Sequence, residues 1–263
     1  MNGKLARIAV LVSVGRHPVS GVARYSRNDA AALETGRALA QQHGALLDVV
    51  HAGDPSNAAL EAYLALGAAR VEVLVCDPAD DAVAALAQRV QGYDLVLTGT
   101  CAEGAFDSGM LPYRLAAALG YMLVGSAVDV VIENGDVTTA TVRQFLPKGV
   151  RRRVQTPLPA VVAVHPLAPV QPLYAYARLR AGTVDTRSVA PRGADAEAAH
   201  WTVAPATRKP VRLAAPEKRS GHARMMSATT TESRGGSVVI EGTSVEKAQV
   251  ILAYLREHQL IDY

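Results

Sequence analysis

The sequence predicts an α/β fold with a doubly wound, mostly parallel sheet and helices on both faces. Three observations predict it. Short apolar runs alternate with helical segments through the first 125 residues. The segments between those runs are long enough for right-handed crossover connections. An Asn134-Gly135 turn and further short strands follow, which indicates a hairpin added to the sheet.

Each element of the first half has a local signal. The apolar runs predict strands over 8–14, 46–52, 71–76 and 94–98, and the spacing of apolar residues predicts helices over 29–42, 54–66, 80–91 and 111–119. His43-Gly44 suits the end of the first helix. Asp54-Pro55 suits the start of the second. This Rossmann-like order is expected to bind ligands beyond the carboxyl ends of the strands.

The second half is expected to be less regular. Strands are predicted over 127–133, 136–145, 150–155 and 160–164, and residues 166–242 show little periodicity. A final helix over Ser244–Gln259 is expected, with Thr243 and Glu246 forming a capping box. The irregular stretch is either disordered or lies on another protein, and the capped helix favours the second. We expect an α/β domain over 1–212 and an extended C-terminal arm over 213–263.

Composition excludes several classes of protein. The chain has 263 residues, 49% of them hydrophobic, which argues against general disorder. Its net charge of +3 does not indicate a nucleic-acid binder. No apolar run approaches the roughly 20 residues of a membrane helix, and no signal-peptide pattern is present. Cys76 and Cys101 suit neither a disulfide framework nor a metal cluster. A soluble, cytoplasmic protein is expected.

The charges are unevenly distributed. Residues 28–107 hold three basic and twelve acidic side chains, whereas residues 141–220 hold fourteen basic and four acidic ones. The basic part either meets a charged partner or is a solvated face with a flexible tail.

Three loops are expected to converge on the carboxyl edge of the sheet: 15–29, 51–55 and 99–109. The first and third are polar, contain glycine and lead into helix N-termini, which suits phosphate binding, with Arg16, Arg24 and Arg27 as sources of charge. A dinucleotide fingerprint and a P-loop sequence are both missing.

No catalytic set stands out. Cys101 and His17 lie in these loops, but ordinary loop residues are the better interpretation. Glu103 and Asp107 suit an acid–base pair, and equally well a ribose contact or a helix cap.

The chain resembles the beta subunit of electron-transfer flavoproteins nearly from end to end. The matching stretches are VLVSVGRHPV, NDAAALETGRALA, GDPSNAALEAYLALGAARVEVLV, YDLVLTGTCAEGAFDSGMLPYRLAAALGY, TPLPAVVAVHP and QPLYAYARLRA. Ser26-Arg27 replaces the family's Asn-Pro, and the ligand loop is shorter than usual. We therefore identify the chain as a member of a divergent branch.

The resemblance implies a heterodimer in which an alpha subunit holds the redox FAD and the beta subunit holds AMP, or in one branch a second FAD. It implies electron flow from a primary dehydrogenase to a quinone oxidoreductase or another acceptor, with no catalytic residues in the beta subunit. It also implies that the C-terminal arm packs on the alpha subunit.

The resemblance also assigns residues. It implies cofactor contacts from Ser13, Ser26, Arg27, Asn28, Asp29, Ala52, Gly99, Thr100, Cys101, Asp107, Ser108 and Gly109. It implies partner contacts from Ser20, Tyr174, Leu179 and Arg180.

Two other hypotheses remain open. One is a stand-alone adenine-nucleotide hydrolase or ATP-binding sensor with the same sheet topology. The other makes Arg151–Arg153, with Arg178 and Arg180, a nucleic-acid surface, although few aromatic residues lie among them. The resemblance instead implies that these arginines meet an acidic partner, and a solvated face is the third interpretation.

Overall fold

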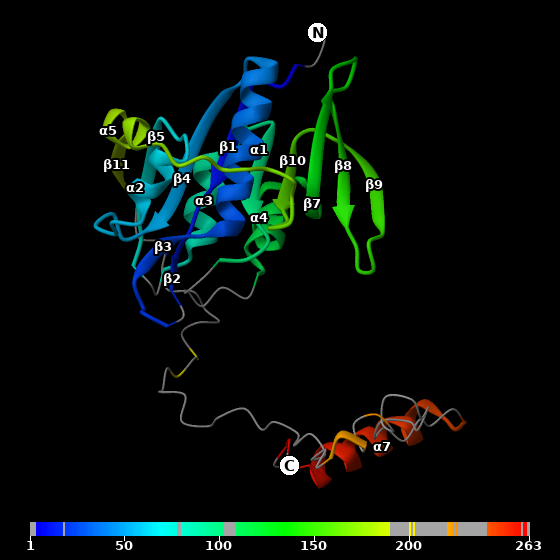
Figure 1. The fold of residues 1–263 in the computed structure, drawn as a ribbon. Coiled ribbons are helices and arrows are strands. Elements are labelled where there is room, and N and C mark those ends of the chain that lie inside the picture. The colour runs from blue at the N-terminus through cyan, green and yellow to red at the C-terminus, as the bar shows by residue number, and fades with distance from the viewer. Residues whose placement is uncertain are drawn as a thin grey trace. The chain divides into compact units, whose positions relative to one another are not determined.

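A computed structural model provides the structure of the chain. It describes residues 4–17, 19–77, 80–102, 109–189, 200, 202, 220–222, 225, 241–258 and 260–261. By its internal contacts the chain divides into two units, residues 1–201 and 202–263, and each is described by itself. The first unit holds the sheet (Figure 1), and helix α7 (Ser244–Glu257) belongs to the second.

The first unit is built on a sheet with the strand order β11-β5-β4-β1-β6-β10-β7-β8-β9. Neighbours from β11 to β7 are parallel, and β7, β8 and β9 pair antiparallel. This confirms the predicted fold class. The strands are β1 (Arg7–Leu11), β4 (Leu46–Gly53), β5 (Arg70–Val75), β6 (Leu95–Gly99), β7 (Met122–Glu133), β8 (Thr139–Phe145), β9 (Arg151–Pro157), β10 (Ala160–Val164) and β11 (Thr183–Ser188).

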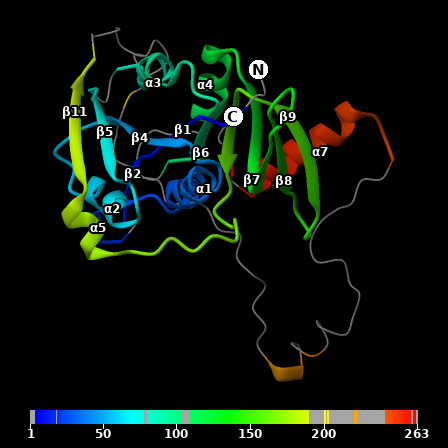
Figure 2. The ribbon, with the colours of Figure 1, turned by 90° about the horizontal axis from the view of Figure 1, so that it is seen from above.

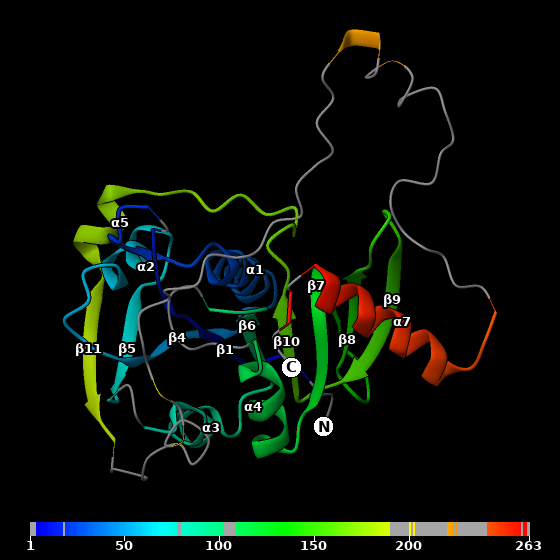
Figure 3. The same ribbon diagram turned by 90° about the horizontal axis from the view of Figure 1, so that it is seen from below.

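Helices cover both faces of the sheet. Figures 2 and 3 show α1 (Arg27–His43) and α2 (Leu60–Ala65) on one face and α3 (Ala82–Val90) and α4 (Leu111–Leu119) on the other. In β1, Ile8 and Val10 join the core under α1, whereas Ala9 and Leu11 join the core under α3 and α4. Side chains alternate across a strand, so a strand buried on both faces reads as a continuous apolar run.

Helix α1 lies close against the sheet. A Cβ atom on Gly36 would lie 2.7 Å from Cγ2 of Val10, so the missing side chain permits this approach. The helix ends where predicted, because Gly44 takes the left-handed conformation (φ 66°) and donates its N–H to the Ala40 carbonyl.

The predicted strand over 8–14 is wrong at its end. β1 stops at Leu11, and β2 (Val14–Arg16) pairs with β3 (Ala23–Tyr25) in a separate antiparallel ribbon. The chain leaves the sheet at Ser13, whose N–H donates to the carboxylate of Asp29. A tertiary contact therefore ends the strand.

The predicted start of the second helix at Asp54-Pro55 is also wrong, because α2 begins at Leu60. The Asp54 carboxylate accepts hydrogen bonds from the N–H and hydroxyl of Ser56, and Asn57 accepts one from the Ala59 N–H. Short polar side chains that bind nearby backbone compete with the helix. They hold residues 54–59 in a turn.

The added hairpin differs in length from the prediction. β7 starts at Met122 rather than Ala127, and its first part pairs with β10 before its second part pairs with β8. Because Glu133 pairs with Thr139, residues 134–138 form the loop, which is longer than the predicted two-residue turn.

The stretch over 166–242, predicted to be irregular, contains α5 (Tyr176–Ala181) and β11. β11 pairs with β5 along its full length, yet its side chains are mostly exposed and polar. An exposed edge strand lacks the alternation by which strands are recognised in a sequence.

The capping box before α7 is confirmed. The Glu246 N–H donates to Oγ1 of Thr243, and the Thr243 N–H donates to Oε2 of Glu246. The helix ends at Glu257 rather than at the predicted Gln259.

Candidate functional site

The carboxyl ends of β1, β4 and β6 meet at one edge of the sheet, because these strands are parallel neighbours. Ser13 follows β1, His51 lies near the end of β4, and Gly99 ends β6. The N-terminus of α1 reaches the same edge through Asp29. Ligands of such sheets bind at this edge.

The buried carboxylate of Asp29 is the centre of this site. One carboxylate oxygen accepts hydrogen bonds from the Ser13 N–H, at 2.7 Å, and from the Ser13 hydroxyl. The other oxygen accepts the Gly99 N–H at 3.1 Å. One side chain of α1 thus fixes the loops after β1 and β6.

Burial raises the pKa of Asp29 from 3.8 to about 6, although the hydrogen bonds from Ser13 and Gly99 favour the ionised form. The carboxylate is therefore mostly ionised at neutral pH, and it places a negative charge beside the first turn of α1. This weakens the expectation of a phosphate site at that helix end. The Asp29 N–H, one of the amides in the first turn of α1, also donates to the Ser26 hydroxyl at 3.4 Å and is therefore already paired.

Tyr63 supports the same arrangement from α2. Its buried hydroxyl donates to the Ser13 carbonyl at 2.6 Å and accepts the Ser26 N–H at 3.0 Å. Sequence reasoning missed this residue. The available signal is a tyrosine on the apolar side of a short helix, because a buried hydroxyl needs a polar partner.

Asn28 holds the loop after β6. Its side-chain amide donates to the carbonyl of Cys101 at 3.0 Å and approaches the sulfur at 3.3 Å. Gly109 returns to this loop with φ 77°, and a Cβ atom there would lie 3.2 Å from the Thr100 carbonyl. The described ends of the loop over 99–109 therefore lie together.

His51 is a second buried residue that sequence reasoning missed. Its Nδ1 lies 2.8 Å from the Val12 carbonyl, which requires a proton on Nδ1. Burial lowers the pKa of His51, so the imidazole is neutral at pH 7. A neutral ring with Nε2 as an acceptor lies beside Gly53, whose Cβ would be 2.8 Å from that nitrogen.

Two of the residues considered for catalysis, His17 and Cys101, have structural contacts. His17 accepts the N–H groups of Val19 and Ser20 through Nδ1 and so holds the turn of the β2–β3 ribbon. Cys101 contacts Asn28. Glu103 and Asp107 lie outside the described residues.

Comparison with known proteins identifies the family of the chain. The electron transfer flavoprotein domain family matches residues 20–205. A protein of Chromohalobacter salexigens named electron transfer flavoprotein subunit beta is 37% identical over 258 residues, which cover 97% of this chain and 95% of that protein. The chain belongs to the electron transfer flavoprotein family. It is a homologue of the beta subunit.

The structure brings together many of the cofactor residues that the electron transfer flavoprotein resemblance implies. Six of them lie in the hydrogen-bonded cluster: Ser13, Ser26, Asn28, Asp29, Gly99 and Cys101. Arg27 is exposed. The side chain of Ala52 packs against the core on the face of the sheet that α3 and α4 cover. Asp107 and Ser108 lie outside the described residues.

The implied partner residues of this family member lie on other surfaces. Ser20 is exposed at the tip of the β2–β3 ribbon, and Tyr174 is exposed just before α5. Within α5, Leu179 is half-buried and Arg180 is exposed.

The arginines of β9 each have a contact within the sheet. The Arg151 guanidinium lies 4.7 Å from the centre of the Phe145 ring, Arg152 donates to Gln144, and Arg153 lies 3.8 Å from Glu133.

The described residues show neither a metal site nor a membrane-spanning helix. Among them, no group of three or more histidine, cysteine, aspartate or glutamate side chains is arranged to hold a metal ion. No helix in the described part of the chain is long and apolar enough to cross a membrane.

Proposed function

We propose that this chain is the beta subunit of a heterodimeric electron-transfer flavoprotein. It would act in the cytoplasm, passing electrons from a primary dehydrogenase through FAD to a quinone oxidoreductase or another acceptor. The observation that carries the proposal is the 37% identity over 97% of the chain. The alpha subunit holds most of the FAD, and this chain supplies orientation and no catalytic residue of its own.

Bound FAD supplies the redox chemistry of such a complex. The residues of this chain contribute a rigid backbone at the carboxyl edge of the sheet. Asp29 and Tyr63 fix the backbone at Ser13 and Gly99 through buried hydrogen bonds. A fixed backbone orients a ligand or a partner without reorganisation on binding.

We propose that AMP is held at this edge. The residues fit it in two respects. Gly99 has no side chain, and a Cβ there would come within 2.7 Å of the Asn28 Cβ, so the N-terminus of α1 can lie directly against the end of β6 and the two elements form one edge. Within the described residues, α4 begins at Leu111 and its N-cap residue, Met110, provides no side-chain cap, which leaves amides of the first turn for a phosphate. Repulsion from ionised Asp29 favours α4 over α1 for that phosphate.

We propose that two surfaces meet partners. Ser20, Tyr174, Leu179 and Arg180 would contact the alpha subunit and the dehydrogenase. The arm over 213–263 would pack on the alpha subunit. Exposed Ile251 and Tyr254, three positions apart on one face of α7, support this, because an apolar face on a helix favours burial.

Native mass spectrometry of the protein purified from its host tests the proposal. A one-to-one complex with a larger chain carrying FAD is expected, with additional mass equal to AMP. A single chain that hydrolyses ATP, and loses this activity in Asp107→Ala, would overturn it in favour of the stand-alone hydrolase or sensor.

A second experiment tests whether Leu179 contacts the dehydrogenase. Leu179→Ala is expected to slow reduction of the bound flavin by the dehydrogenase while FAD content stays unchanged. Val131→Ala, at an exposed position on β7, is the matched control. Equal rates for the two variants would remove Leu179 from the interface.

A further inference from the structure

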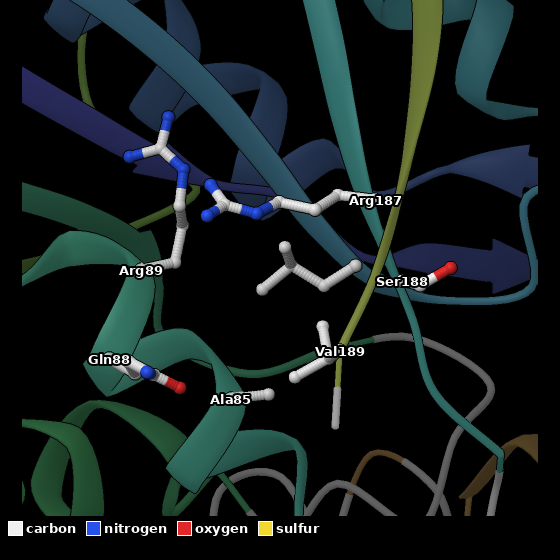
Figure 4. A pocket seen from close by; sticks show the side chains of 7 residues that line it. Ala85, Gln88, Arg89, Arg187, Ser188 and Val189 are labelled. Carbon is white, nitrogen blue, oxygen red and sulfur yellow. The ribbon is translucent and has the colours of Figure 1, made fainter. Parts of the chain in front are cut away.

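A cavity of about 390 Å³ lies between α3 and the strands β5 and β11, and no part of the proposed function uses it (Figure 4). Its size falls in the range of small-molecule sites. One end is apolar and is formed by Leu74, Ala85 and Val189. Leu74 and Ala85 are buried core residues, so this end is a fixed surface.

The other end is cationic. Figure 4 shows the guanidinium groups of Arg89, from α3, and Arg187, from β11, lying beside each other. Arg89 is held in place, because it donates two hydrogen bonds to Oε2 of Glu72, at 2.8 and 2.6 Å, and one to the Tyr93 hydroxyl. Arg187 reaches Oε1 of Glu72 only at 3.4 Å, and 63% of its side chain is exposed.

Arg89 and Arg187 share one carboxylate at this end. Arg89 lies 2.6 Å from Glu72, whereas Arg187 lies 3.4 Å from it. In the wider network, Arg70, Arg89 and Arg187 pair with Asp48, Glu72 and Asp185. Because its contact with Glu72 is long and its side chain is mostly exposed, Arg187 is the guanidinium of this cavity that an incoming anion can engage.

We propose that this cavity binds a small organic carboxylate with an apolar body. The carboxylate lies against Arg187 and Arg89, and the body lies on Leu74, Ala85 and Val189. The planar fork of an arginine matches two carboxylate oxygens, and charge-assisted hydrogen bonds of this kind are the strong ones. An inorganic anion would leave the apolar end unused, and a neutral apolar molecule would leave the guanidinium groups unused.

Isothermal titration calorimetry of the purified protein, with any chain that co-purifies, tests this with three probes: 4-phenylbutanoate, its neutral amide and inorganic phosphate. Saturable binding of 4-phenylbutanoate is expected, with a Kd on the order of 1 mM or tighter. The amide and phosphate are each expected to bind at least about tenfold more weakly, because each lacks one of the two contacts.

The variant Arg187→Gln is expected to weaken binding of 4-phenylbutanoate at least about tenfold, since it removes the exposed guanidinium. Arg152→Gln, on β9, is the matched control and should bind as the unchanged protein does. Equal binding of acid and amide, equal binding of acid and phosphate, or no saturation up to about 10 mM would overturn the proposal. So would unchanged binding in Arg187→Gln. The comparison of the probes uses the unchanged protein and therefore does not depend on the folding of a variant.

Discussion

Replacing Asp29 by asparagine should alter how stability depends on pH. Burial raises the pKa of this carboxyl from 3.8 in the unfolded chain to about 6 in the folded one. Between these values the folded state binds more protons than the unfolded state, so the stability contributed by Asp29 falls as pH rises. It is fully present below pH 3.8 and is lost above pH 6. About two pKa units correspond to about 3 kcal/mol.

The asparagine variant does not titrate at this position. It also carries a constant penalty of about 1–3 kcal/mol, because the amide NH₂ group faces the N–H of Ser13 or Gly99 and leaves a buried donor unpaired. The free energy of unfolding of the variant minus that of the unchanged protein should therefore rise by about 2–3 kcal/mol between pH 4 and pH 7.

Urea denaturation followed by circular dichroism, at half-unit steps from pH 4 to pH 7 and at one protein concentration, measures this difference. Asp54→Asn is the control, because hydrogen bonds from Ser56 lower the pKa of exposed Asp54 and its effect has the opposite sign. A difference between Asp29→Asn and the unchanged protein that stays flat across this range would refute the assignment of a raised pKa to Asp29.

Three further substitutions test contacts around the site and the arm. Gly99→Ala should destabilise the protein by at least about 1–3 kcal/mol, because the added Cβ would lie within 2.7 Å of Cβ in Asn28; thermal denaturation measures this. Tyr63→Phe should lower the free energy of unfolding by about 1–3 kcal/mol, because the buried N–H of Ser26 loses its acceptor; urea denaturation measures this. Thr243→Ala should weaken α7 by about 1 kcal/mol through loss of the capping box, and faster proteolysis within 244–257 is the expected result.

Each of these has a control. Gly135→Ala is the matched control, because Gly135, like Gly99, lies outside the left-handed region and its added Cβ would come no closer than 3.6 Å to another atom. Tyr113→Phe removes a hydroxyl from a side chain that is 53% exposed and should change stability little. Ser244→Ala leaves both hydrogen bonds of the capping box in place. An effect of Tyr113→Phe as large as that of Tyr63→Phe would contradict the role assigned to the buried hydroxyl.

Much of the first unit was predictable because its signals are local. The apolar runs of β1, β4, β5 and β6 reflect burial on both faces, and α4 begins and ends at the predicted residues. Gly44 and Thr243 mark helix ends through backbone conformation and capping, which depend on neighbouring residues only.

Most of the wrong predictions fall where a contact between residues far apart in the sequence determines the local structure. Ser13 leaves β1 to bind Asp29, and β11 joins the sheet although its exposed polar residues carry no strand pattern. The turn over 54–59 is an exception: its signal was local, since Asp54 and Asn57 bind nearby backbone, and it was missed.

For the candidate site, the loops that meet could be predicted from the sequence, because parallel strands bring their carboxyl ends to one edge. Motifs spread along the chain also indicated the family. The position of the Asp29 carboxylate between Ser13 and Gly99, and the contacts of Tyr63 and His51 with the same loop, depend on tertiary packing. A buried polar group must find partners, and those partners are 16 to 70 positions away along the chain. Such pairings follow from the packing of α1 and α2 on the sheet, and the spacing of residues along one segment does not contain them.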